Sequence, residues 1–287
     1  MSRIPVFFRR EMTAASRFFA PGTFKPAACV DDWRAAGLPI EVRDFEPVSR
    51  ADLCLAHDPR YVDGVLSCEI ANGFGGCQRD VAASLPYTSG AMVAAAEEAL
   101  LNGGAACAPV SGFHHAGWDT GGGYCTFNGL IVSARHLLEQ GYVRRVGILD
   151  LDQHYGDGTE EIRQRLGLTR IRHYSAGLEQ RGPRDAERFF DELPGRVRAF
   201  ADCQVLLYQA GADPHVDDPL GGWMSDEQLA RRDRIVFETA AEIGLPVAWN
   251  LAGGYRRDAS GGISPVLSIH RRTMEACAAI FVGVAQG

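Results

Sequence analysis

Short apolar runs alternate with longer segments of predicted helix over most of the chain. The predicted strands are 4–8, 40–42, 105–110, 146–149, 171–174, 205–208 and 247–251. The predicted helices are 89–101, 127–140, 158–166, 185–200, 225–243 and 263–285, with a shorter one after His57-Asp58-Pro59. Such alternation with short links is typical of a mostly parallel sheet covered by helices on both faces. We therefore expect an α/β fold, a three-layer α/β/α arrangement in a single domain spanning residues 1–287.

The remaining segments are predicted from local signals. Residues 10–30 carry several phenylalanines and prolines and are predicted to form an irregular loop with exposed aromatic side chains. Asp31-Asp32-Trp33 is predicted to cap a short helix. Residues 71–90 are rich in Gly, Ser and Asn, which favours a long surface loop near a functional site. Ser225 and Gln228 have the spacing of a capping box at the start of a helix.

Composition and charge narrow the class of protein. The 287 residues are 46% hydrophobic and 23% charged, as in a soluble globular protein. The net charge of -7, with no basic cluster, argues against nucleic acid as a partner, since phosphate binding needs concentrated Lys and Arg. The eight cysteines show no C-x-x-C spacing and are expected to be reduced thiols of a cytosolic protein. No apolar stretch approaches the ~18 residues of a membrane span, so we expect a cytoplasmic protein without membrane contact.

Unusual polar residues follow four of the predicted strands. In open parallel sheets, ligands bind beyond the carboxyl ends of the strands. We therefore expect the polar residues after these four strands to meet at one edge of the sheet. They are His114 and His115 after 105–110, Asp150, Asp152, His154 and Asp157 after 146–149, Asp213 after 205–208, and Tyr255 after 247–251.

The Asp/His cluster has the composition of a metal site. Side chains alternate along an extended segment, so Asp150, Asp152 and His154 project to one side. Carboxylate oxygens and an imidazole suit a divalent transition metal, and zinc is the usual one for mixed nitrogen and oxygen ligands. Asp152, His154 and Asp213 would supply three ligands and leave room for water and substrate. The alternative interpretation is a polar loop whose aspartates cap the next helix.

The other polar residues fit the hydrolysis of an amide. This reaction needs an activated water, a general base and an acid for the leaving amine. His114 and His115 could transfer the protons, with Asp150 and Asp157 behind them as partners that bias their tautomers. Tyr255 follows a Gly-Gly turn and could donate a hydrogen bond to the developing oxyanion. The competing interpretations are a structural histidine pair and a packed core tyrosine.

Together these motifs resemble the histone deacetylase superfamily, in order and spacing, over nearly the whole chain. The matching motifs are His57-Asp58-Pro59-x-Tyr61-Val62, His114-His115-Ala, Gly122-Gly123-Tyr124-Cys125, Asp150-x-Asp152-x-His154-x-Gly-Asp-Gly, Gly211-Ala-Asp213 with Asp218-x-Leu220-Gly, and Gly253-Gly254-Tyr255. The details are most similar to the class IV branch and its bacterial amidohydrolase-like relatives. The features that favour this branch are Gly112-Phe113-His114-His115, the Asp-x-Gly-Gly-Gly run at 119–123, and Gln-His-Tyr at 153–155.

The resemblance implies the arginase/deacetylase fold and a zinc-dependent deacetylase with one zinc ion per chain. It implies a substrate that is an acylated lysine or a small acylated amine, and a structural potassium ion near Asp150, Asp152 and His154. The implied site residues are the zinc ligands Asp152, His154 and Asp213, His115 as general base with His114 as its electrostatic partner, Tyr255 as oxyanion donor, and Gly123, Tyr124 and Leu220 along the substrate channel.

Three departures from the family pattern bear on these expectations. Residues 175–179 lack the second channel aromatic of class I, which predicts a wider mouth. The serine that helps to hold potassium is not found at 170–172 on the following strand. The chain has no long inserted loop of the kind with which acetylpolyamine-specific members dimerise, which counts against that substrate.

Other functions on the same fold stay open as alternatives. A binuclear manganese ureohydrolase needs a second carboxylate cluster, whereas Gly-Ala precede Asp213 and Pro-His-Val separate it from Asp217. A catalytically silent metal-binding member is a further alternative, although each catalytic position holds a competent residue. Among amide hydrolases, acetyl-lysine, small acetylated amines as in acetylpolyamine-type enzymes, and longer fatty acyl-lysines are all candidate substrates. We expect residues 18–24 and 71–90 to form the rim that selects among them.

Overall fold

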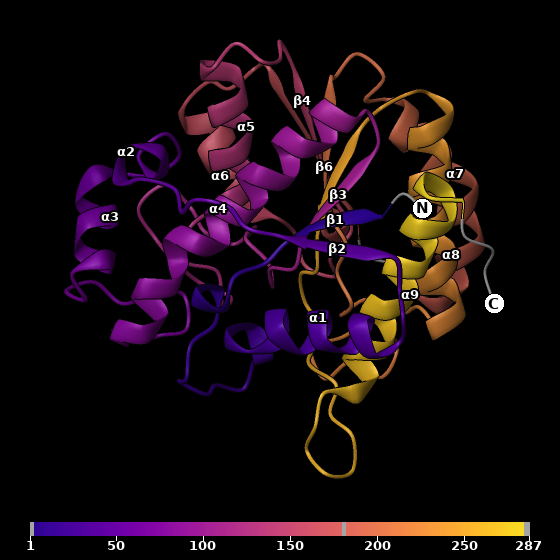
Figure 1. The fold of residues 1–287 in the computed structure, drawn as a ribbon, viewed down its shortest axis with the longest axis horizontal. Helices are drawn as coiled ribbons and strands as arrows, with labels where there is room; N and C mark the ends of the chain where they lie inside the picture. Colours follow the sequence, from indigo (N-terminus) through magenta and orange to yellow (C-terminus); the bar gives the residue numbers. More distant parts are fainter. Residues whose placement is uncertain (1–2, 180–181, 284–287) are drawn as a thin grey trace.

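Seven parallel strands form the centre of the structure, a computed structural model that describes residues 3–179 and 182–283 (Figure 1). Their order across the sheet is β2-β1-β3-β7-β6-β4-β5. Every neighbouring pair is parallel. The strands are β1 (Ile4–Phe7), β2 (Ile40–Arg43), β3 (Ala105–Ala108), β4 (Val146–Asp150), β5 (Ile171–Ser175), β6 (Val205–Gln209) and β7 (Val247–Asn250).

Helices cover both faces of this sheet (Figure 1). They are α1 (Lys25–Ala35), α2 (Arg50–Leu53), α3 (Pro59–Leu66), α4 (Arg79–Asn102), α5 (Gly129–Glu139), α6 (Asp157–Arg165), α7 (Ala186–Arg198), α8 (Asp226–Glu242) and α9 (Ser264–Phe281). Residues of α1, α7, α8 and α9 share one hydrophobic core, and residues of α3, α4, α5 and α6 share a second.

Alternation along the strands separates the two cores. In β3, Ala105 and Cys107 face the first core, and Ala106 and Ala108 face the second. Successive side chains of a strand point to opposite faces, so a strand buried on both sides reads as a continuous apolar run. The three-layer α/β/α arrangement expected from the sequence is confirmed.

Several local expectations are confirmed by the helix starts. The Ser225 hydroxyl accepts from the Gln228 N–H and the Gln228 side chain accepts from the Ser225 N–H, which is the predicted capping box. The helix after His57-Asp58-Pro59 is α3, whose first N–H groups are accepted by the Asp58 carboxylate. The closing helix ends at Phe281, and Ala285, its predicted end, lies outside the described residues.

Two expectations in the N-terminal third are wrong. Asp31-Asp32-Trp33 does not begin a helix but lies in the second half of α1, because Pro26 in the first turn starts that helix earlier. The predicted 71–90 loop ends early, since α4 begins at Arg79 and runs through Pro86. Val81 and Leu85 are buried one turn apart, and this packing outweighs the backbone bond that Pro86 cannot donate.

All eight cysteines are free thiols, and five of them are buried. Across residues 3–179 and 182–283, no helix combines the length and the apolar character needed to span a bilayer.

Candidate active site

The predicted site residues follow the ends of four strands that are neighbours in the sheet. β3, β7, β6 and β4 lie side by side, and their last residues are in register: Ala108 opposite Asn250, Gln209 opposite Asn250, and Asp150 opposite Gln209. Parallel strands end at the same edge, so the four polar loops that follow them emerge together. This arrangement accounts for how residues up to 141 positions apart, from His114 to Tyr255, come to one place.

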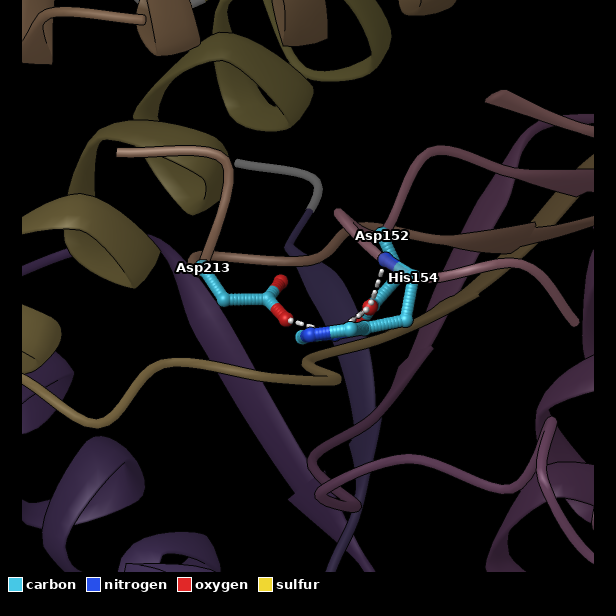
Figure 2. A group of neighbouring side chains, drawn as sticks. All are labelled: Asp152, His154 and Asp213. Carbon is cyan, nitrogen blue, oxygen red and sulfur yellow. Dashed lines mark hydrogen bonds and ion pairs between the residues drawn. The ribbon is translucent and has the colours of Figure 1, made fainter. Parts of the chain in front are cut away.

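Asp152, His154 and Asp213 converge in the loops after β4 and β6 (Figure 2). One donor atom from each lies within 4.8 Å of the other two. Nδ1 of His154 is 3.0 Å from Oδ2 of Asp213 and 3.3 Å from Oδ1 of Asp152. Both carboxylates are buried, and His154 is partly exposed. This is the one such group of His, Cys, Asp and Glu within the described ranges.

The electrostatics of this group fit a divalent cation. Burial raises the pKa of the Asp213 carboxyl, and the neighbouring charge of Asp152 raises it further, to about 7. Two buried carboxylates repel each other unless a positive charge lies between them. Carboxylate oxygens and an imidazole nitrogen are donors that zinc accepts, and catalytic zinc sites use three protein ligands and keep a further position open. The three residues therefore could hold one divalent metal ion.

Glycines allow the loops to approach this closely. A Cβ on Gly211 would lie 2.6 Å from the Cα of Asp152, and a Cβ on Gly253 would collide with the Asp213 carboxylate. Real Cβ atoms do not approach other atoms so closely, so a side chain at either position would push the loops apart. The Gly-Ala-Asp and Gly-Gly-Tyr motifs are thus explained by packing around Asp213.

The histidine pair is held by two carboxylates in different surroundings. Nδ1 of the buried His114 is 2.8 Å from Oδ2 of Asp150, and Nδ1 of the more exposed His115 is 2.7 Å from Oδ1 of Asp157. Burial opposes a charge on His114, but Asp150 and Asp152 outweigh it and raise the pKa of His114 to about 9. Burial lowers the pKa of His115, and the charge of His114 lowers it further. The two rings therefore favour different protonation states near neutral pH.

Two residues that the sequence did not single out hold Asp150. Ser175, the last residue of β5, lies opposite Asp150 in the sheet, and its Oγ is 3.2 Å from Oδ2 of Asp150. The same Oγ accepts from the N–H of Gly156. Gln209 donates to the other Asp150 oxygen at 3.0 Å. The sequence showed no serine at 170–172, and the β4–β5 register places Ser175, at the end of β5, beside Asp150.

Tyr255 reaches the site on a turn of two left-handed glycines. Gly253 and Gly254 have φ of +28° and +92°, and the Tyr255 N–H donates to the Asp218 carboxylate at 2.8 Å. Burial raises the pKa of the Tyr255 phenol far above its usual value, and the charge of Asp213 raises it further. The phenol therefore stays protonated and can act as a hydrogen-bond donor.

A buried lysine holds the backbone of this turn by hydrogen bonds. Lys25, in the first turn of α1, is fully buried, and its Nζ donates to the carbonyls of Ala252 and Gly253. Burial lowers the pKa of Lys25 to about 8, although nearby carboxylates oppose that shift. No residue pattern singled out Lys25, because residues 10–30 were predicted to form an irregular loop, whereas α1 begins at Lys25.

Replacing Lys25 by Met should lower kcat for an acylated amine by ~10²-fold, since a shift of about 1 Å in a catalytic group has an effect of that size. The Tyr255 turn would lose two hydrogen bonds, whereas Asp152, His154 and Asp213 keep theirs. Steady-state kinetics with zinc analysis of the same sample is the measurement. Lys25→Arg, which can still donate to the two carbonyls, serves as the control. A Met variant with wild-type kcat would remove Lys25 from this role.

The three residues that the resemblance implies for a substrate channel lie next to residues of this site. Gly123 has φ of +52°, and its backbone packs so closely on the His115 ring that a Cβ there would collide with it. The Tyr124 ring lies 5.7 Å from the Tyr255 ring. Leu220 is exposed on the loop after β6, and its N–H donates to Asp218, which also holds Tyr255.

Comparison with known proteins agrees with this geometry. The family model described as "Histone deacetylase domain" matches residues 26–169. Acetylpolyamine amidohydrolase of Mycoplana ramosa is 32% identical over 263 residues, which cover 78% of this chain and 73% of that protein.

Two solved structures share the fold. The HDA15 HD domain matches with a TM-score of 0.76 at 18% identity. The match covers 100% of this chain and 91% of the HDA15 chain. Acetylpolyamine aminohydrolase from Burkholderia pseudomallei matches with a TM-score of 0.71 at 18% identity. The match covers 96% of this chain and 99% of that protein's chain. The motifs, the fold and these similarities place this chain in the histone deacetylase family.

Proposed function

We propose that this protein is a zinc-dependent hydrolase that removes an acetyl or longer acyl group from an N-acylated amine. The observation that carries the proposal is the convergence of three groups at one sheet edge: the Asp152, His154 and Asp213 cluster, the His114 and His115 pair with its two carboxylates, and the Tyr255 turn. The free thiols support a cytoplasmic setting for this activity.

In this proposal, Asp152, His154 and Asp213 hold one zinc ion. A zinc ion lowers the pKa of a water molecule and polarises a carbonyl group. The presence of one candidate cluster in the described parts of the chain supports one ion rather than the two of a manganese ureohydrolase. The position of Ser175 against Asp150 also supports the structural potassium ion that the family resemblance implies.

The proposed proton transfers use the differences between the two histidines. His115, whose neutral form is favoured, removes a proton from the attacking water and passes it to the leaving nitrogen, while Asp157 holds its Nδ1. His114, whose charged form is favoured, stays an electrostatic partner held by Asp150. Tyr255 donates to the oxygen that becomes negative. The C–N bond breaks, and a carboxylate and a free amine leave.

The substrate class is supported by the relatives. Proteins named acetylpolyamine amidohydrolase match this chain in sequence and in fold, which supports a small acylated amine, with the acylated lysine side chain as the second candidate. The test is kcat/KM of the zinc-loaded protein for an N-acetylated diamine and for a peptide with ε-acetyl-lysine. We expect hydrolysis of at least one of the two, and the ratio of their kcat/KM values assigns the substrate class. Hydrolysis of neither, by protein with one zinc per chain, would contradict the proposal.

Aromatic rings surround the proposed channel. The rings of Phe18 and Phe74 lie 4.7 Å apart, and Phe74 lies 5.8 Å from Tyr124. Phe19 is stacked on Tyr255 at 6.0 Å with an interplanar angle of 13°, and more than half of its surface is exposed. The segments predicted to form the rim therefore contact the two channel tyrosines, which supports a role in selecting the acyl group.

Replacing Phe18 and Phe19 together by Ala should change the ranking of acyl chain lengths. Each aromatic contact contributes about 0.5–1.5 kcal/mol, so their loss should shift the kcat/KM ratio of octanoyl to acetyl substrates by roughly 10-fold. The measurement is kcat/KM for acetyl, octanoyl and myristoyl substrates. Tyr142→Ala is the control, because this exposed aromatic precedes β4 at the opposite edge of the sheet. An unchanged ranking would exclude these rings from selection.

A further inference from the structure

Arg232 on α8 is a fully buried arginine that is not part of the site described above. Its exposed fraction is 0%, and that of its neighbour Asp233 is 1%. Nε of Arg232 donates to Oδ1 of Asp233 at 2.8 Å. The hydroxyl groups of Tyr208 and Thr273 also donate to the Asp233 carboxylate. The Asp233 carboxylate therefore accepts hydrogen bonds from three side chains, and its bond to Nε orients the Arg232 guanidinium.

The other side of the guanidinium contacts the two loops that carry the metal-binding aspartates. Nη1 of Arg232 donates to the carbonyl of Leu151 at 3.1 Å and to the carbonyl of Gly211 at 2.7 Å. Leu151 directly precedes Asp152, and Gly211 lies two residues before Asp213. One nitrogen thus bridges the two segments, by hydrogen bonds that its positive charge strengthens.

This bridge lies at the end of the pairing between the two segments, where the Leu151 N–H makes a last backbone bond to the Gln209 carbonyl at 3.1 Å. The pairing of β4 with β6 ends at Asp150 and Gln209. Within the described residues, 3–179 and 182–283, no backbone N–H donates to the carbonyl of Leu151 or of Gly211. The Gly211 backbone also packs directly on the Cα of Asp152. Arg232 therefore fixes the segments at their point of closest approach.

The cost of burying this ion pair indicates a role beyond stability. A buried ion pair often stabilises a protein no more than apolar residues of similar volume would, because both charges lose their hydration. A metal site needs its ligands at set distances, and groups around the ligands control those distances. The bridge meets that need.

We propose that Arg232 is a positioning residue of the metal site, whose guanidinium sets the separation of the Asp152 and Asp213 loops and thereby the affinity for a divalent cation. The inference rests on the metal centre of the proposed function. It concerns binding rather than turnover, and it can be tested without a substrate.

The test compares a variant without the bridge with a variant that loses an exposed arginine of the same helix. Arg232→Met with Asp233→Asn removes the bridge and leaves no lone buried ion, and Arg234→Met is the control. Zn²⁺ affinity is measured by competition with a chromophoric chelator, and site geometry by the visible absorption of the Co²⁺-loaded protein. We expect the double variant to bind Zn²⁺ ~10–100-fold more weakly, as outer partners of metal ligands do when removed, with a changed Co²⁺ spectrum. Arg234→Met should stay within about 2-fold of wild type.

A folded double variant with wild-type Zn²⁺ affinity and Co²⁺ spectrum would overturn the inference. If the double variant does not fold, Arg232→Gln with Asp233→Asn decides, because the Gln amide nitrogen lies where Nε of the arginine lies and falls short of both carbonyls. Wild-type affinity and spectrum in that variant would overturn the inference equally. Wild-type protein that binds zinc but hydrolyses no acylated amine would overturn the proposed function and leave this inference intact.

Discussion

Replacing His115 by Ala is expected to lower kcat for an acylated amine by ~10²–10⁴-fold, the usual contribution of a general acid–base residue. His115 is the histidine of the pair whose pKa is lowered, first by burial and then by the charge of His114. Its Nδ1 faces Asp157, which leaves Nε2 free to exchange protons with the substrate side. The Ala variant loses that exchange, whereas the metal cluster keeps all three residues.

The measurement is kcat with zinc content determined on the same protein. His136→Ala is the matched control, because His136 is a partly buried histidine on α5 that also contacts a carboxylate, Glu97 at 3.1 Å. It should keep kcat within about 2-fold, as substitutions away from the site usually do. If His115→Ala retained wild-type kcat, another group would have to act as the base.

Replacing Tyr255 by Phe should lower kcat by ~10²-fold or more, the effect of removing one oxyanion donor from a preorganised site. The change deletes only the hydroxyl, so the contacts of the ring with Phe19 and Tyr124 persist. KM should change much less than kcat, because the donor acts on charge that develops in the transition state.

Zinc content and circular dichroism of Tyr255→Phe should match those of wild type. Tyr142→Phe, an exposed tyrosine at the far edge of the sheet, controls for loss of a hydroxyl as such. A Tyr255→Phe enzyme with unchanged kcat would remove the phenol from the reaction, even if the metal dependence held.

The sequence was sufficient to predict the architecture and the residues that meet in the site. The reason is that the chemistry lies directly after strands: Asp150, His114, Asp213 and Tyr255 each follow a short apolar run, and strand ends in a parallel sheet share one edge. The residues of one motif also lie close together in the chain, so their spacing can be recognised from the sequence alone.

The anchors behind the site could not be predicted in this way. Lys25 binds carbonyls 227 and 228 positions away, and Arg232 binds carbonyls 81 and 21 positions away. Their acceptors are backbone atoms, which every residue has, so no residue pattern marks the contact. Ser175 was missed for a related reason, since the β4–β5 register that places it beside Asp150 exists only in the folded sheet.

The predicted start of α4 was wrong because local composition and tertiary packing favour different structures there. Gly, Ser and Asn indicated a loop, but Val81 and Leu85 bury one face of the helix before and around Pro86. Tertiary burial of an amphipathic face commonly outweighs local propensity.

Titration of Zn²⁺ into metal-free protein, with hydrolysis of an N-acetylated diamine as the readout, tests the central claim most directly. Wild-type protein should gain activity in proportion to bound zinc and reach its maximum at one ion per chain. Asp152→Ala should bind zinc weakly and show at least ~10³-fold less turnover, because the site loses a ligand on which the water activation depends. Equal activity of metal-free and zinc-loaded wild type, or full activity of Asp152→Ala, would contradict the account.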